Sequence, residues 1–311
     1  MAVIALAIRT EDLTKYYTVG LGQTSLGLEG LNLEVEEGQI FGLVGPNGSG
    51  KTTTLKLLLG LIFPTRGTGE VLGLPLGSAE YKARVGYLPE GPYFYEHLNA
   101  PELLKMYGSL FGLGGKILEN RIRELLELVD MWDRRNYRVV NYSRGMRQRV
   151  GVAQALINEP DLLFFDEPTA GLDPIGAKDI REVILKLRER GKTVFLCSHL
   201  LKEMEPLCDN IAILDRGQLI TQGSVDEMLA PKGGRYRLEA TGVNEELEQK
   251  LASRAAETVR LDDTFRALFS DQQTAFEAAK VVTDNGAQLI NVGPDRRTLE
   301  EVFIEAVGKE P

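Results

Sequence analysis

The sequence is poor in the residues that build metal centres and disulfide frameworks. Its 311 residues include two cysteines, two histidines and one tryptophan. Cys197 and Cys208 have no metal-type spacing, which is compatible with a reducing cytosol and excludes a disulfide scaffold. No run approaches the roughly 18 to 20 apolar residues that a membrane span needs. If the protein serves a membrane process, another chain must supply the span.

An excess of positive charge is also missing. The formal net charge is −9, so the totals do not predict a basic nucleic-acid footprint, although a local basic patch stays possible. Residues 1–8 are apolar, but Arg9, Glu11 and Asp12 interrupt them at once, so we interpret them as an edge strand rather than a signal peptide. With 43% apolar and 26% charged residues, the composition is typical of one large globular domain or a medium and a small one.

The most informative stretch is Gly45-Pro46-Asn47-Gly48-Ser49-Gly50-Lys51-Thr52, which fits the phosphate-loop pattern G-x-x-x-x-G-K-[ST]. A short buried strand, 40–44, precedes it, and a helix is predicted to begin with Thr53. Backbone N–H groups of such a loop point at an anion, and the following helix adds its positive end. Lys51 would reach the β- and γ-phosphates, and the Thr52 hydroxyl would ligate Mg²⁺. An ordinary glycine-rich turn is the alternative.

Polar side chains follow three further predicted strands, 85–88, 162–165 and 193–197. These side chains belong to Glu90, to the pair Asp166 and Glu167, and to His199. Ligands bind at the carboxyl edge of open parallel sheets. Four such groups at one edge therefore favour a functional site. The alternatives are carboxylates that only cap turns and a histidine with a structural role. Asp166 suits a Mg²⁺-holding role, and Glu167 is placed to orient or deprotonate a water molecule.

Residues 100–158 are expected to be mostly helical, with one apolar face on each of two helices. The first face comprises Leu103, Met106, Tyr107 and Leu110, and the second Ile122, Leu125, Leu126 and Val129. Ser143 is a good N-cap for a helix over 145–158. That helix start, with Arg144, Arg147 and Arg149, would suit an anion, although a capped helix with solvated arginines is the alternative.

The pattern changes after a linker at 231–234. We predict strands at 235–240, 257–261, 265–270 and 287–292, helices at 243–254 and 271–285, and a last helix after Thr298 capped with Glu301. The first six elements match a split β-α-β of the ferredoxin-like kind, and they contain no catalytic cluster.

Together these motifs resemble the nucleotide-binding subunit of an ABC transporter, over about residues 5–230. In the family's order the matching residues are Tyr17 for the aromatic that stacks on adenine, Gly45 to Thr52 for Walker A, Glu90 for the Q-loop glutamine, Tyr142 to Met146 for the signature, Asp166 and Glu167 for Walker B and the catalytic glutamate, Asp173 for the D-loop aspartate, and His199 for the switch histidine. The Gly-Met-Arg-Gln-Arg ending and Leu-Glu-Glu-Val-Phe-Ile near the C-terminus are similar to a bacterial export subfamily, whose membrane part is usually a separate polypeptide.

The resemblance implies an α/β P-loop NTPase core (1–230) with a helical subdomain at about 90–158, followed by an accessory α+β domain (235–311). It implies three catalytic residues, Lys51, Glu167 and His199. The implied nucleotide contacts are Tyr17, Gly45, Asn47, Gly48, Ser49, Gly50, Lys51, Thr52, Thr53, Glu90, Ser143, Gly145 and Asp173, and the implied Mg²⁺ ligands are Thr52, Glu90 and Asp166. Glu90, Arg144 and Met146 depart from the family pattern: Glu90 loses the amide donors of glutamine and adds a charge near Glu167.

The expected protein is therefore an ATPase that uses ATP and Mg²⁺ and works as a head-to-tail dimer with a second copy or a homologous ATPase. It would sit at the cytoplasmic face of the membrane, bound to a transmembrane permease through 90–158, with no nucleic-acid partner. The rival interpretations are a soluble ABC-type ATPase acting on nucleic acid or ribosomes, and a catalytically weak nucleotide switch.

Overall fold

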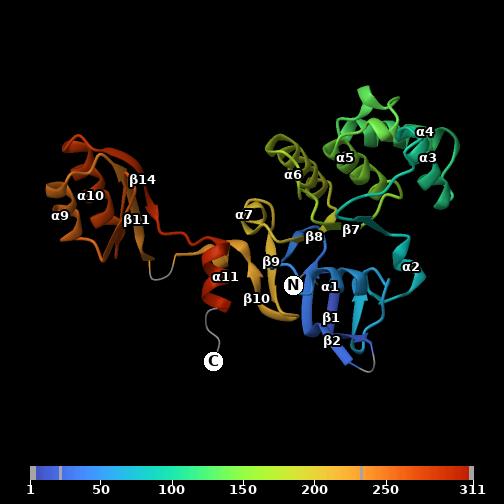
Figure 1. Cartoon of the computed structure of the whole chain (residues 1–311), viewed down its shortest axis with the longest axis horizontal. Helices are drawn as coiled ribbons and strands as arrows, with labels where there is room; N and C mark the ends of the chain where they lie inside the picture. The colour runs from blue at the N-terminus through green and yellow to red at the C-terminus, as the bar shows by residue number, and fades with distance from the viewer. Residues whose placement is uncertain (1–4, 21–22, 232–233, 308–311) are drawn as a thin grey trace. The chain divides into compact units, whose positions relative to one another are not determined.

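A computed structural model describes residues 5–20, 23–231 and 234–307 of the chain (Figure 1). Its contacts divide the chain into two units. One comprises Met1–Val225 with Phe303–Pro311, and the other comprises Asp226–Val302. Each unit is described by itself below.

The first unit is built on a six-stranded sheet in the order β10-β9-β3-β8-β7-β6. Its strands are β3 (Ile40–Val44), β6 (Val85–Leu88), β7 (Leu162–Asp166), β8 (Thr193–Ser198), β9 (Asn210–Asp215) and β10 (Gln218–Ser224). The first five run parallel, and β10 is antiparallel to β9. Every residue of β3, β7 and β8 is buried, as expected of apolar strands that are covered on both faces.

A second, antiparallel sheet in the order β2-β1-β4-β5 lies in the same unit. It comprises β1 (Leu6–Val19), β2 (Gln23–Glu36), β4 (Arg66–Val71) and β5 (Leu74–Pro75). Helix α1 (Lys51–Leu58) contacts strands of both sheets. One hydrophobic cluster, which includes Leu31, Leu55 and Phe164, therefore joins the two sheets through this helix.

Three helices, α3 (Ala100–Leu110), α4 (Gly115–Leu128) and α5 (Arg144–Ala155), pack against one another and form the green group in Figure 1. The predicted apolar face of α4 is buried throughout. The predicted face of α3 is wrong at its end, because Leu110 is 76% exposed and Leu104 is buried instead. Leu110 is the last residue of α3, so its turn extends past the neighbours that cover Leu103.

Apart from two helices of the second unit, which are given below, the other helices of the described residues are short with one exception. They are α2 (Ala79–Lys82), α6 (Pro174–Glu189), α7 (Leu201–Met204), α8 (Val225–Leu229) and α11 (Leu299–Val307), with 3₁₀ turns at Trp132–Arg134 and Val139–Asn141. As predicted, α11 begins with a reciprocal cap: the Glu301 carboxylate accepts from the Thr298 N–H, and the Thr298 hydroxyl accepts from the Glu301 N–H.

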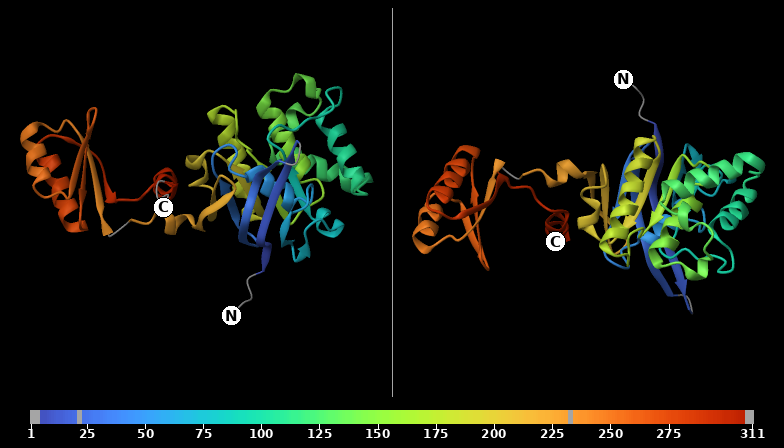
Figure 2. Two further views of the ribbon diagram at one scale, coloured as in Figure 1. Left: turned by 60° about the horizontal axis from the view of Figure 1, so that its bottom comes forward. Right: turned by 90° about the horizontal axis from the view of Figure 1, so that it is seen from above.

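The second unit has the ferredoxin-like topology predicted from its sequence. Its antiparallel sheet has the order β12-β13-β11-β14. The elements are β11 (Tyr236–Thr241), α9 (Glu245–Ala252), β12 (Glu257–Leu261), β13 (Thr264–Phe269), α10 (Gln272–Asp284) and β14 (Gln288–Pro294). Figure 2 shows both helices on one face of this sheet. Between them and the sheet lies a separate core that includes Leu238, Phe265 and Phe269.

Gly86 on β6 tests how tightly the helical group packs on the parallel sheet. A Cβ at this position would lie 2.0 Å from the backbone oxygen of Ala155 at the end of α5, and neither backbone can move freely. We expect Gly86→Ala to lower the free energy of unfolding by about 3 kcal/mol in urea titrations. The control, Gly91→Ala, places its Cβ in open space. Equal stability of the two variants would contradict this packing.

Candidate active site

The register of the parallel sheet brings the predicted polar groups to one edge. Val44 pairs with Ser198, Cys197 with Asp166, and Phe165 with Leu88, so the four strands end level with one another. A cleft of about 310 Å³ opens at this edge. Its lining consists of Tyr17, Leu26, Gly27, Asn47, Gly48, Gly50, Lys51, Thr52, Thr53, Glu90, Asp166, Glu167 and His199. The structure thus gathers eleven of the residues expected to bind or hydrolyse nucleotide.

The phosphate loop is shaped to receive an anion. Gly50 has a φ of 107°, which favours glycine, and α1 begins directly after it at Lys51, two residues earlier than predicted. The Lys51 ammonium donates to the carbonyls of Gly45 (2.6 Å) and Pro46 (3.1 Å). The Ser49 hydroxyl is buried without a hydrogen-bond partner among the described residues. An orphaned hydroxyl and the free N–H groups of a first helical turn both fit a phosphate group.

Glu167 is held from three sides. Its carboxylate lies 2.9 Å from His199 Nδ1 and 4.0 Å from Lys51 Nζ, and it accepts a hydrogen bond from Ser198 Oγ at 3.3 Å. Its backbone is left-handed, with φ 47°, and its N–H donates to the carbonyl of Cys197. A left-handed glutamate is strained, and such strain occurs at functional sites where the surroundings hold it in place. The strain turns this carboxylate into the cleft.

Asp166 is buried beside Glu167. Burial, assisted by the negative charges of Glu167 and Glu90, raises the pKa of Asp166 from its ordinary 3.8 to about 6. The described residues contain no cluster of three or more acidic, histidine or cysteine side chains that could hold a metal by itself. The donor set of Thr52, Glu90 and Asp166 is all oxygen, which fits Mg²⁺ that takes its other ligands from substrate phosphates and water.

Tyr17, which is expected to stack on adenine, also reaches the cleft. Its hydroxyl lies 3.2 Å from the Thr53 hydroxyl, which fixes the ring beside the start of α1. Three contributions to the site were not predicted: Leu26 and Gly27 line the cleft, and Ser198 orients Glu167. These are ordinary strand residues whose sequence carries no motif, so only the fold could identify them.

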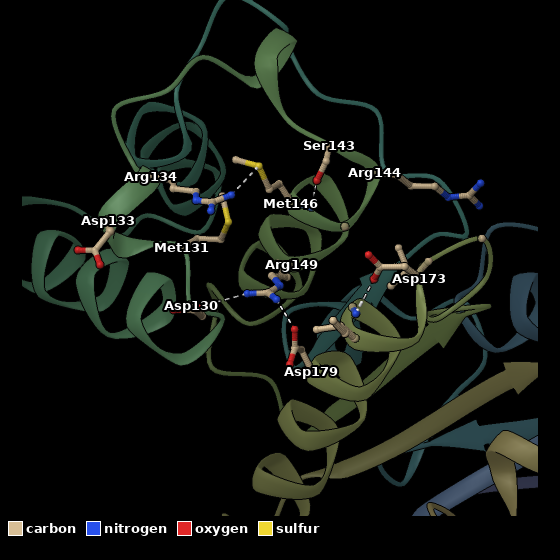
Figure 3. Close-up of a pocket in the computed structure, with 15 residues that line it drawn as sticks. Asp130, Met131, Asp133, Arg134, Ser143, Arg144, Met146, Arg149, Asp173 and Asp179 are labelled. Carbon is tan, nitrogen blue, oxygen red and sulfur yellow. Dashed lines mark hydrogen bonds and ion pairs between the residues drawn. The ribbon is translucent and has the colours of Figure 1, made fainter.

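Ser143, Gly145 and Asp173 do not line this cleft but a second pocket, of about 500 Å³ (Figure 3). As predicted, the Ser143 hydroxyl caps α5, accepting from the Met146 N–H at 3.2 Å. Asp173 caps α6 in the same way, accepting from the Gly176 N–H at 2.7 Å. The nucleotide contacts proposed for this chain are therefore divided between two surfaces.

A strand–loop–helix phosphate site at the carboxyl edge of a parallel sheet, followed by a Walker-B carboxylate pair, defines the P-loop NTPase class. Within that class, residues 28–170 match the family model described as ABC transporter.

The curated relatives are similar over nearly the whole chain. An uncharacterized ABC transporter ATP-binding protein, all4389 of Nostoc sp. (strain PCC 7120), is 43% identical over 97% of this chain and 90% of its own length. The bacitracin transport ATP-binding protein BcrA of Bacillus licheniformis is 35% identical over 97% of each chain. The Nod factor export ATP-binding protein I of Cupriavidus metallidurans is 36% identical over 91% of this chain and 93% of its own length.

Among solved structures, one described as the dimeric post-hydrolysis state of the ATP-binding cassette MJ0796 bound to ADP and Pi matches with a TM-score of 0.65. It is 25% identical and covers 70% of this chain and 98% of that one. The chain belongs to the ABC transporter ATP-binding proteins, and it is an ATPase subunit that binds and hydrolyses ATP to power transport.

The raised pKa of Asp166 predicts a pH-dependent stability. Burial disfavours the charged carboxylate in the folded state, so ionisation of Asp166 lowers the free energy of unfolding. This loss is absent below pH 3.8, where Asp166 is protonated in both the folded and the unfolded state, and complete above about pH 6, where it is charged in both. Without nucleotide and in a metal chelator, we expect Asp166→Asn to stabilise the protein by about 3 kcal/mol at pH 8, and progressively less towards pH 4.

Thermal melts across this pH range measure the effect, with the exposed Asp133→Asn as control. A difference between Asp166→Asn and wild type that does not change with pH contradicts the prediction.

Proposed function

We propose that the chain powers export by a separate transmembrane subunit, through ATP-dependent head-to-tail dimerisation. The division of the nucleotide contacts carries this proposal. Lys51 and Glu167 line one cleft, whereas Ser143 and Gly145 line a different pocket. A second copy, turned head to tail, would bring its Ser143 pocket onto the ATP held by the first. Each ATP would then be bound between two copies.

The cleft supplies the parts that hydrolysis needs. Lys51 and the N–H groups of the loop bind the β- and γ-phosphates, and Tyr17 stacks on the adenine. Glu167, oriented by His199 and Ser198, accepts a proton from the attacking water as its oxygen bonds to the γ-phosphorus and the bond to the bridging oxygen breaks. Mg²⁺ bound by Thr52, Asp166 and Glu90 would neutralise charge on the phosphates.

Loss of the γ-phosphate removes the contacts that only a closed dimer makes, so hydrolysis would open the dimer. Opening and closing of two bodies attached to membrane helices is a means of moving those helices. The name of one relative, a Nod factor export protein, supports a transport direction out of the cell for this chain as well, and the name of another, a bacitracin transport protein, supports transport.

A groove beside the helical group supports the contact with the membrane subunit. It measures about 380 Å³ and lies beyond Tyr87 and Pro89, next to the Glu90 loop. Its lining is rich in aromatic rings, with Tyr93 97% exposed at its rim. Exposed aromatic side chains around an apolar groove are typical of protein interaction sites. Within the described residues, every helix falls short of what a bilayer crossing needs.

Glu167→Gln tests the assignment of the base. Glutamine keeps the size of the side chain but cannot accept the proton, so we expect ATP turnover to fall at least about 100-fold. We also expect ATP, but not ADP, to hold the variant as a dimer in size-exclusion chromatography with light scattering. Turnover equal to that of wild type would contradict the assignment of Glu167 as the base. A variant that stays monomeric with ATP would contradict the proposed dimerisation.

Tyr93→Arg tests the groove. Because Tyr93 is almost fully exposed, the substitution should leave folding and basal ATPase activity unchanged. We expect its binding to membranes of the native host to weaken at least tenfold in sedimentation titrations. In alanine scans, loss of an aromatic anchor at such an interface costs about 1.4 kcal/mol or more of binding free energy, which corresponds to this factor.

The matched control is Tyr137→Arg, at another exposed tyrosine that does not line the groove. If Tyr93→Arg and wild type bind the membranes equally, the groove is not the contact.

A further inference from the structure

Arg144 is the residue at which the signature departs most from the family, and the structure gives it an unusual setting. It is the first residue of α5, next to the Ser143 cap, and its side chain is exposed. Its guanidinium lies flat against Gly171 in the loop between the Walker-B carboxylates and α6. A Cβ on Gly171 would lie 2.3 Å from Nη1 and 2.7 Å from Nη2 of Arg144, so the guanidinium occupies the space that a side chain at this position would need.

The carboxylates around this pocket do not neutralise Arg144. Asp130 and Asp179 both pair with Arg149, and Asp173 accepts from the Gly176 N–H as the cap of α6. Figure 3 shows Arg144 pointing away from these pairs, with Asp133 on the opposite side of the pocket. Among the ion pairs that the described residues form, none includes Arg144. Its positive charge therefore stands unneutralised at the rim of the pocket.

The surroundings of Ser143 leave space for a ligand. A Cβ on Gly145 would meet nothing closer than the Ser143 hydroxyl, at 4.0 Å, so the first turn of α5 is open on this side. A guanidinium offers a planar set of donors that matches two phosphate oxygens, and such charge-assisted pairs are stronger than neutral hydrogen bonds. The nucleotide cleft of a second copy would present a triphosphate together with Glu90, Asp166 and Glu167, which is a strongly negative surface.

We infer that Arg144 binds the triphosphate of the ATP held by the second copy, and so makes closure of the dimer depend on ATP more strongly than Ser143 and Gly145 alone would. The inference rests on the proposed head-to-tail dimer. The guanidinium lies against Gly171 in the same pocket lining as Ser143, where it is available to the incoming phosphates. Because a symmetric dimer contains two such contacts, loss of Arg144 acts twice on each closure.

The test uses the full chain with Glu167→Gln, which prevents turnover. Arg144→Gln removes the charge and keeps a shorter polar side chain, and Arg144→Lys keeps the charge without the planar donors. We expect the ATP concentration for half-maximal dimer to rise at least tenfold with Arg144→Gln and about threefold with Arg144→Lys. The control is Arg147→Gln. Arg147 is on the same helix and is also outside the ion pairs of the described residues, but it does not line the pocket. This substitution should change the ATP concentration for half-maximal dimer less than twofold.

Two further measurements separate this role from a structural one. ADP binds the cleft of its own chain, so Arg144→Gln should leave ADP affinity and the melting temperature unchanged. If Arg144→Gln lowers both, the residue acts by fixing α5 on the loop at Gly171, and the inference is overturned. If Arg144→Gln dimerises like the parent, the inference is wrong while the proposed dimer stands. If the Glu167→Gln parent itself does not dimerise with ATP, the proposed function fails and the inference falls with it.

Discussion

The register of four parallel strands is the constraint on which the site depends. Hydrogen bonding between β3, β8, β7 and β6 fixes where each strand ends, and each end carries one polar group or loop. Lys51, Glu167 and His199 are more than thirty residues apart in the sequence, yet two contacts of 4.0 Å and 2.9 Å join them. A shift of one residue in any of these strands would turn its buried side chains to the opposite face and displace its terminal group from the cleft.

This register explains why so much of the site could be predicted. An apolar run that ends in a charged pair, such as the one before Asp166, marks both the strand and its functional end. The ferredoxin-like unit was predictable for a related reason, since its strands and helices alternate with clear caps and turns. Features that depend on the surroundings could not be predicted. The left-handed backbone of Glu167, the hydroxyl of Ser198 directed at it and the exposed position of Leu110 follow from how the elements pack, which residue type and spacing do not encode.

The distribution of charge separates the two nucleotide-related surfaces. The cleft combines one buried lysine with three carboxylates. In the pocket at Ser143, Asp130 and Asp179 pair with Arg149, and Arg144 belongs to none of the ion pairs of the described residues. Ser143 and Gly145 line the pocket, and Lys51 and Glu167 line the cleft, so neither surface contains all the residues expected to contact a nucleotide. A triphosphate bound in the cleft would present negative charge to Arg144 of a second copy. Such complementarity favours a head-to-tail pairing of copies and disfavours pairings of like with like.

The cleft contains several groups in unfavourable states, and this bears on how ATP acts. Asp166 is buried with its charged form disfavoured, Glu167 is strained, and the Ser49 hydroxyl has no hydrogen-bond partner among the described residues. Each state lowers the stability of the unliganded fold by an amount that a bound nucleotide and cation can restore, since they supply the missing charges and acceptors. Relief of these unfavourable states thus becomes part of the free energy that ATP binding releases. A protein that cycles between two states under the control of ATP depends on this difference, because a ligand shifts an equilibrium only by its differential affinity for the two states.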